Sequence, residues 1–353
     1  MVNGAVFVVL IGFVVGLVML VRRGVLTQHR ADLGSLARMG SATEQGNARE
    51  VLRSLRARNL AAVVAVVAGG FAAVTLQHIF PDAAGLALAL APAGIWVLAA
   101  SVFAFWRLPH EFTALPTDSF EQSTAELVPR TVSRFGPAWG LMLPAALLAT
   151  TVLGLLVAGL ASGTDAQGRY RNLPYVSSGG AELDSNMVIT GLQIGEGAVG
   201  PFPGWYYGMP VMVLLLLGTV VGLRALSSNA HRPRLRGVDL RGFDDAVRTN
   251  VGYVISTGFS AMLCFQAAPM MLVAASAVSS SGTHPVYTVG EAIDEAVVPS
   301  LEIDPAAGAL SMGILVGAVL LLVVGATLLL RLLGWLGPTL KPLRLPATEI
   351  AGT

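Results

Sequence analysis

Seven long stretches of the chain contain no Asp, Glu, Lys or Arg, and no other feature constrains the fold as strongly. A bilayer core about 30 Å thick is crossed by roughly 20 apolar residues of α-helix. Unpaired backbone groups are costly in hydrocarbon, so each stretch is predicted to be a transmembrane helix. The predicted spans are about 3–21, 60–80, 85–106, 137–161, 205–223, 251–277 and 309–330.

The basic residues are sorted by side. If the segment after the first span is cytoplasmic, the inner segments hold 20 of the 22 Lys and Arg, and the outer ones hold Arg169 and Arg171. Cytoplasmic loops of membrane proteins are enriched in Lys and Arg. The chain is therefore predicted to be an all-α polytopic integral membrane protein of the plasma membrane. Residues 1–353 form one transmembrane domain of seven helices, with the N-terminus outside, the C-terminus cytoplasmic and a small extracellular cap.

Two long external loops, 162–204 and 278–308, would form this cap. The first contains the β-branched stretch 186–195, which favours a small hairpin. In the second, the capping pattern and helical spacing of 288–299 predict a short amphipathic helix on the outer surface. Its polar face carries Glu291, Asp294 and Glu295.

The basic cytoplasmic loops, 22–59 and 224–250, contain short amphipathic stretches just before a span. In the first of them, Arg49, Arg53 and Arg56 share one helix face, and apolar side chains share another. Such a stretch can dock a cytoplasmic partner. The more common arrangement is an interfacial helix that lies in the headgroups with its arginines toward anionic lipid.

The segment 200–210 is unusually rich in aromatic residues, among them Trp205, Tyr206 and Tyr207. Aromatic residues at the end of a span are typical of the membrane–water interface, where their amphipathic rings settle. The sequence therefore predicts an aromatic anchor at the start of the fifth span. These rings are also the candidate wall of an external binding site.

Several spans contain helix-breaking or small residues. Proline removes a backbone hydrogen bond and tends to kink a helix. Pro269 is the candidate hinge, because Gln266 lies close to it in the same span. Pairs of glycines four residues apart favour close helix packing. The prolines within predicted spans are Pro92, Pro144, Pro210 and Pro269, and the glycine pairs are Gly12/Gly16, Gly218/Gly222 and Gly313/Gly317.

The composition argues against several chemistries. Ionisable residues inside the membrane usually mark ion or proton pathways, and the predicted spans carry no Asp or Glu for such a role. The one cysteine cannot form a Cys-based metal site or a disulfide within the chain. No two of the five histidines have metal-ligand spacing. We expect no cofactor, no metal and no nucleic-acid partner.

The functional prediction is accordingly broad. The chain is expected to be a non-enzymatic accessory, sensing or permease-type component. It would act with the lipid bilayer and with a cytoplasmic partner protein or a separate ATPase. The alternative is a membrane-embedded enzyme that acts on lipid or lipid-linked sugar at the outer face. Its catalysts would be acids of the external loops, namely Asp165, Glu182, Asp184, Glu196 and the three acids of 288–299.

Overall fold

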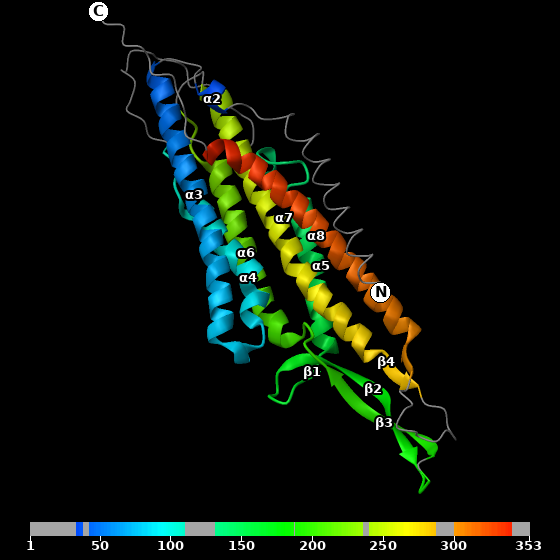
Figure 1. Ribbon diagram of the computed structural model, residues 1–353. Coiled ribbons are helices and arrows are strands. Elements are labelled where there is room, and N and C mark those ends of the chain that lie inside the picture. Colours follow the sequence, from blue (N-terminus) through cyan, green and yellow to red (C-terminus); the bar gives the residue numbers. More distant parts are fainter. Residues whose placement is uncertain are drawn as a thin grey trace, which may run out of the picture.

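The computed structural model describes residues 33–37, 42–109, 131–186, 188–235, 240–286 and 300–340. Figure 1 shows a bundle of long helices with a small β-structured cap at one end. Six of the described helices are long and apolar enough to cross a membrane. The first predicted span, 3–21, lies outside the described residues, as does the predicted surface helix 288–299.

The six long helices match six of the predicted spans, but several run well past the predicted ends. They are α3 (Ala42–Ile79), α4 (Leu86–Phe105), α5 (Met142–Ala161), α6 (Trp205–His231), α7 (Leu240–Ser281) and α8 (Pro305–Leu340). The short helical elements are α2 (Leu33–Leu36), which precedes α3, and the 3-10 turns η1 (Pro81–Ala83) and η2 (Val132–Arg134), which lie between long helices. α3 has 38 residues and α7 has 42. At 1.5 Å per residue these helices are about 57 and 63 Å long, so each is longer than a bilayer core is thick.

The extra length contains the amphipathic stretches that precede these spans in the sequence. We predicted separate short helices there, whereas α3 and α7 run through without a break. The apolar faces of both extensions are buried in one core cluster with the rest of the bundle. These two stretches are therefore parts of long bundle helices, not separate helices that lie flat on the lipid headgroups. The buried side chains of the extensions are Ala48, Val51, Leu52, Leu55, Leu240, Phe243 and Val247.

α7 forms the centre of the bundle and packs against α4, α5, α6 and α8. On its α4 side, Trp96 fills a notch made by Gly218 and Gly222 of α6 and Gly258 of α7. A Cβ at position 218 would lie 2.8 Å from the indole ring, and the indole Nε1 donates a hydrogen bond to the Gly218 carbonyl at 3.1 Å. The glycine pair of α6 thus makes room for a tryptophan from a neighbouring helix. In the other described pair, Gly317 faces Met271 and Gly313 is open.

The positions of the prolines explain which of them affect a helix. Pro92, Pro210 and Pro269 lie inside α4, α6 and α7, respectively. Pro144 was predicted to lie inside a span, but α5 begins only at Met142, so Pro144 lies in its first turn. In the first turn of a helix the missing N–H has no intrahelical partner to lose, so no kink follows from Pro144.

The cap at the far end of the bundle is built from two small antiparallel sheets (Figure 1). The first contains β1 (Gly163–Thr164), β2 (Tyr170–Leu183) and β3 (Ile189–Val199). β2 and β3 pair from Leu173↔Val199 to Leu183↔Ile189, which confirms the predicted hairpin. The second sheet, β4 (Thr283–Val286) with β5 (Ser300–Ile303), was not predicted. It joins the ends of α7 and α8 beside β2.

Candidate functional site

The two tyrosines of the aromatic segment fasten α6 to the tight turn between α3 and α4. The Tyr206 hydroxyl donates a hydrogen bond to the carbonyl of Ala83 at 3.1 Å. The Tyr207 hydroxyl donates to the carbonyl of Ala84 at 2.6 Å, and the Tyr207 side chain is buried. These carbonyls belong to a turn in which Ala84 has a positive φ of 50°. The tyrosines therefore satisfy backbone groups that the turn itself leaves without helical partners.

Trp205 completes this junction on the other side of α6. Its indole lies against Gly159 near the end of α5, where a Cβ would meet the ring at 2.7 Å. The guanidinium of Arg169, from the loop between β1 and β2, lies 5.5 Å above the Tyr206 ring. Trp205 and the two tyrosines thus join α5, α6, the α3–α4 turn and the β1–β2 loop. A role as the wall of an external binding site stays a prediction.

Asp165 organises the loop between β1 and β2. Its carboxylate accepts hydrogen bonds from the backbone N–H groups of Gln167 and Arg169, both at 2.9 Å. It also accepts from the side chains of Arg169 and Arg171. Desolvation acts to raise the pKa of Asp165, but the hydrogen bonds from Arg169 and Arg171 outweigh it and the net shift is downward. An acid held ionised in this way is unsuited to donating a proton.

Asp184 has a similar structural role at the tip of the β2–β3 hairpin. Its side chain accepts hydrogen bonds from the backbone N–H groups of Asn186 at 2.7 Å and Val188 at 2.9 Å. The bonds from Val188 and Asn186 lower the pKa of Asp184. Two of the predicted catalytic acids are thus occupied in holding turns. Glu182 and Glu196 are exposed on the hairpin, and Glu291, Asp294 and Glu295 lie outside the described residues.

Gln266, predicted as part of a hinge in α7, braces the neighbouring helix α4. Pro92 has no N–H, so the Leu88 carbonyl loses its donor and α4 is weakened locally. Next to this break, the Gln266 Nε2 donates to the Ala89 carbonyl at 2.9 Å, and the Ala93 N–H donates to the Gln266 Oε1 at 3.1 Å. In a regular helix the Ala93 N–H would donate to the Ala89 carbonyl. The buried amide of Gln266 instead bonds to both of these groups. α7 continues through Pro269. The hinge at Pro269 stays a prediction.

A large groove lies between α5 and α8, with α7 as its floor. Its volume is about 1000 Å³. Leu173 and Pro174 of β2, together with Phe202 and Pro203, line it at the cap end. A smaller cavity of about 260 Å³ lies between α4, α6 and α7 and shares Pro203, Gln266 and Met270 with the groove. Sites between bundle helices are a usual place for apolar ligands.

The polar side chains that line the groove are already engaged within the protein. Thr150 and Thr151 bond to carbonyls one turn earlier in α5, and Ser281 does the same in α7. The Asp304 carboxylate accepts from the Ala306 N–H at the start of α8. Gln266 is held by α4, as described above. Hydrocarbon is therefore the chemistry that the groove presents to a ligand.

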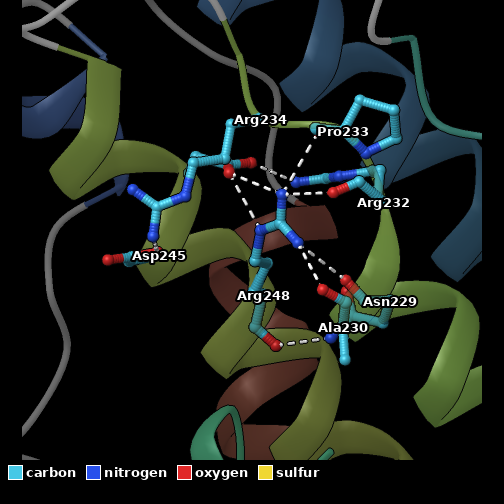
Figure 2. A network of polar contacts seen from close by, with 8 residues as sticks. Asn229, Ala230, Arg232, Pro233, Arg234, Asp245 and Arg248 are labelled. Atoms are coloured by element: carbon cyan, nitrogen blue, oxygen red, sulfur yellow. Dashed lines mark hydrogen bonds and ion pairs between the residues drawn. The ribbon is translucent and has the colours of Figure 1, made fainter. Parts of the chain in front are cut away.

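At the other end of the bundle, called here the arginine end, Arg248 of α7 is the centre of a buried network (Figure 2). Its side chain is 1% exposed. The guanidinium donates hydrogen bonds of 2.8 to 3.2 Å to four carbonyls around the end of α6, those of Asn229, Ala230, Arg232 and Pro233. The last carbonyls of a helix have no intrahelical donors and carry a partial negative charge, so a buried cation is stabilised there.

Asp244 is the counter-charge of this network. It lies one turn before Arg248 in α7 and accepts from the Arg248 Nε at 2.9 Å. Its other oxygen accepts from Arg232, just after α6, and all three side chains are less than 10% exposed. By contrast, the neighbouring Asp245 is 40% exposed and faces Arg234 at 3.5 Å. Two buried guanidinium groups thus share one buried carboxylate, which leaves a net positive charge in the network.

The arginines predicted to contact lipid or a partner lie on the outside of α3. Arg49, Arg53 and Arg56 are exposed, as their common helix face required. The same helix turns Arg58 inward, where it is 3% exposed and its guanidinium lies 4.8 Å above the Phe103 ring. Sequence reasoning did not single out Arg58, although its position two residues before an apolar run was a signal.

Metal binding finds no support in the described part of the chain, which holds no group of three or more His, Cys, Asp or Glu side chains that could bind an ion. His78 is exposed at the end of α3, and the His284 ring lies 3.2 Å from the Gly282 carbonyl.

Comparison with the models of known protein families, with curated proteins and with solved structures gives no match for this chain.

Proposed function

We propose that the protein is a non-enzymatic multi-pass membrane component, of accessory, sensing or permease type, whose groove receives the hydrocarbon chain of a membrane lipid. The observation that carries the proposal is the 1000 Å³ groove between α5 and α8. It is at the upper end of the size range of ligand pockets, and its polar groups are all engaged internally. A ligand there gains apolar burial and meets polar side chains that already bond within the protein.

The state of Asp165 and Asp184 counts against the enzymatic alternative. A membrane hydrolase or transferase at the outer face needs an acid or base whose pKa lies near the working pH. The pKa values of Asp165 and Asp184 are instead lowered, and both carboxylates are occupied by turn hydrogen bonds. A cytoplasmic partner protein or a separate ATPase, docked at Arg49, Arg53 and Arg56, stays part of the proposal.

Filling the groove should expel the lipid. Gly154 of α5 lines the groove, and a Cβ there would meet no atom within 4 Å. Gly154→Trp is therefore expected to fold and to retain several-fold less lipid than the wild type after mild detergent extraction. Native mass spectrometry measures the retained lipid. Gly313→Trp in α8 is the matched control, since that position is equally open but does not line the groove. Equal lipid retention by Gly154→Trp and wild type would contradict the proposal.

The orientation is proposed on charge. The basic residues of the cap are Arg169 and Arg171, whereas the arginine end carries Arg58, Arg232 and Arg248. This distribution favours a cytoplasmic arginine end and a cap outside the plasma membrane.

Cysteine labelling tests the orientation. A membrane-impermeant maleimide added to intact cells is expected to label Asn186→Cys, at the hairpin tip, and to label Gly46→Cys in α3 only after permeabilisation. Both positions are exposed, and the native Cys264 is buried. The reverse labelling pattern would invert the topology.

A further inference from the structure

A separate cavity of about 230 Å³ lies at the arginine end, between α3, the end of α4 and the end of α6. Three of its lining residues are the arginines Arg58, Arg107 and Arg232. None of the described residues that line it is acidic. The cavity is therefore a concentration of positive charge without a carboxylate in its wall.

Two of these arginines are buried and incompletely paired. Arg58 is 3% exposed and Arg232 is 9% exposed. The Nε and Nη2 of Arg58, and the Nε and Nη1 of Arg232, have no hydrogen-bond partner among the residues that the structure describes. A buried donor on a charged group that makes no hydrogen bond is costly. Both arginine side chains line the same cavity, so an anion bound there is the candidate for their missing partner.

The nearby acid does not remove this excess charge. Asp244 accepts from Arg232 through one oxygen and from Arg248 through the other. Burial is the largest influence on the pKa of Arg232 and lowers it; the charge of Asp244 acts to raise it, the positive charge of Arg248 lowers it further, and the net shift is downward. An anion in the cavity would relieve both effects, because it supplies negative charge and hydrogen-bond acceptors together.

We propose that the cavity lined by Arg58, Arg107 and Arg232 binds a phosphate group. Arginine forks bind phosphate oxygens through paired, charge-assisted hydrogen bonds. The cavity is smaller than the 300–1000 Å³ or so of sites for larger small molecules, so it admits a single phosphate-sized group rather than a nucleotide. This site is independent of the groove between α5 and α8, which lies on the other side of the bundle's centre.

The phosphate has two possible sources. Trp106 lines the cavity and its indole Nε1 donates to the Ser54 hydroxyl at 3.2 Å. Tryptophan at the end of a span is typical of the headgroup level of a bilayer. The phosphate of an anionic phospholipid is therefore one source, and free inorganic phosphate is the other.

Thermal unfolding of the full-length protein tests the proposal. Cys264 is the only cysteine and is fully buried, so its reaction with a thiol-reactive dye reports unfolding. Inorganic phosphate, or micelles that contain phosphatidylglycerol, should raise the melting temperature of delipidated protein in a concentration-dependent way. Chloride and acetate at the same ionic strength, and phosphatidylcholine micelles, are the reference conditions and should give a smaller rise.

The variant Arg58→Met separates ligand binding from folding. It keeps an unbranched side chain over Phe103 but removes an unpaired buried charge, so the ligand-free protein should be at least as stable as the wild type. Its apparent affinity for the phosphate ligand should fall at least tenfold, as expected for the loss of charge-assisted hydrogen bonds. Arg53→Met, an exposed arginine of the same helix, is the matched control and should respond as the wild type does.

Each outcome bears on the site in a defined way. Stabilisation by both ligands, or by phosphatidylglycerol alone, supports the phosphate site, and the second result identifies the lipid as its source. An undiminished response in Arg58→Met, or an equal response to chloride and acetate, would overturn the proposal. So would a large loss of stability in ligand-free Arg58→Met, because the chain itself would then supply the counter-charge of Arg58.

Discussion

Asp244→Ala is expected to lower the stability of the protein by roughly 3–5 kcal/mol, the cost of breaking a buried ion pair from one side. The change leaves Arg232 and Arg248 buried without their shared carboxylate. Arg248 would keep its bonds to the carbonyls at the end of α6, but these groups carry only partial charges. The melting temperature, followed through dye labelling of Cys264, should therefore fall steeply. Segment 232–235, which follows α6, should become sensitive to proteolysis.

Asp245→Ala is the matched control for this change. It removes the same carboxylate one position along α7, where the side chain is 40% exposed and faces Arg234 at 3.5 Å. Exposed ion pairs contribute about 0–1 kcal/mol, so little change in melting temperature is expected. Equal effects of Asp244→Ala and Asp245→Ala would show that the buried network does not hold α6 against α7.

Gly252→Ala is the second substitution with a large expected effect. Gly252 lies in α7 where the backbone of Phe135 and Gly136 crosses the helix. A Cβ at this position would overlap the carbonyl oxygen of Phe135, and a backbone carbonyl cannot turn aside as a flexible side chain can. Segment 131–140 would have to move away from α7. Overpacking of this kind costs about 1–3 kcal/mol, and more where backbone must shift.

The same helix provides the control for Gly252→Ala. Gly242 is exposed, and a Cβ there would meet no atom within 4 Å. Because alanine is favoured over glycine in a helix by about 0.8–1 kcal/mol, Gly242→Ala should leave the melting temperature unchanged or raise it. The two variants are thus expected to shift it in opposite directions. A neutral Gly252→Ala would mean that the Phe135 segment yields without cost.

Asp244→Ala and Gly252→Ala both act near the cavity lined by Arg58, Arg107 and Arg232, so they test the surroundings of the proposed phosphate site. The Phe135 ring lies 5.5 Å from the Arg248 guanidinium, so the segment held by Gly252 also covers the buried network. Arg232 belongs to that network and to the cavity wall. A ligand that binds Arg232 is therefore expected to stabilise the junction of α6 and α7 as well as its own site.

The sequence predicted the helices well where a local property decides them. An uncharged apolar run of about 20 residues leaves the backbone little choice in a membrane, and six predicted spans are found as long apolar helices. It did not predict that α3 and α7 extend beyond their spans. The amphipathic pattern of those extensions fits a lipid surface as well as a protein core. Only the packing of side chains such as Leu55 of α3 and Phe243 of α7 into the core of the bundle distinguishes the two.

The aromatic segment shows the same limit at the cap. Its composition indicated a membrane-level anchor, but Tyr206 and Tyr207 also satisfy carbonyls of a turn more than 120 residues earlier in the chain. Likewise, the acids of segment 162–204 read as candidate catalysts. Their hydrogen bonds show that Asp165 and Asp184 hold turns. In each case the residue type indicated a polar or interfacial role, but the sequence did not show which group the side chain would bond to.

The sequence by itself thus determined that the chain is a helical membrane protein, because apolar length and charge are properties of each segment alone. The tertiary structure decided which polar groups are paired. It joined Gln266 to the weak point of α4 and gave Asp244 two buried arginines. It also placed Arg58 and Arg232 in the wall of one cavity and left some of their nitrogens unpaired. These arrangements depend on contacts between residues far apart in the chain, which no periodicity within a segment records.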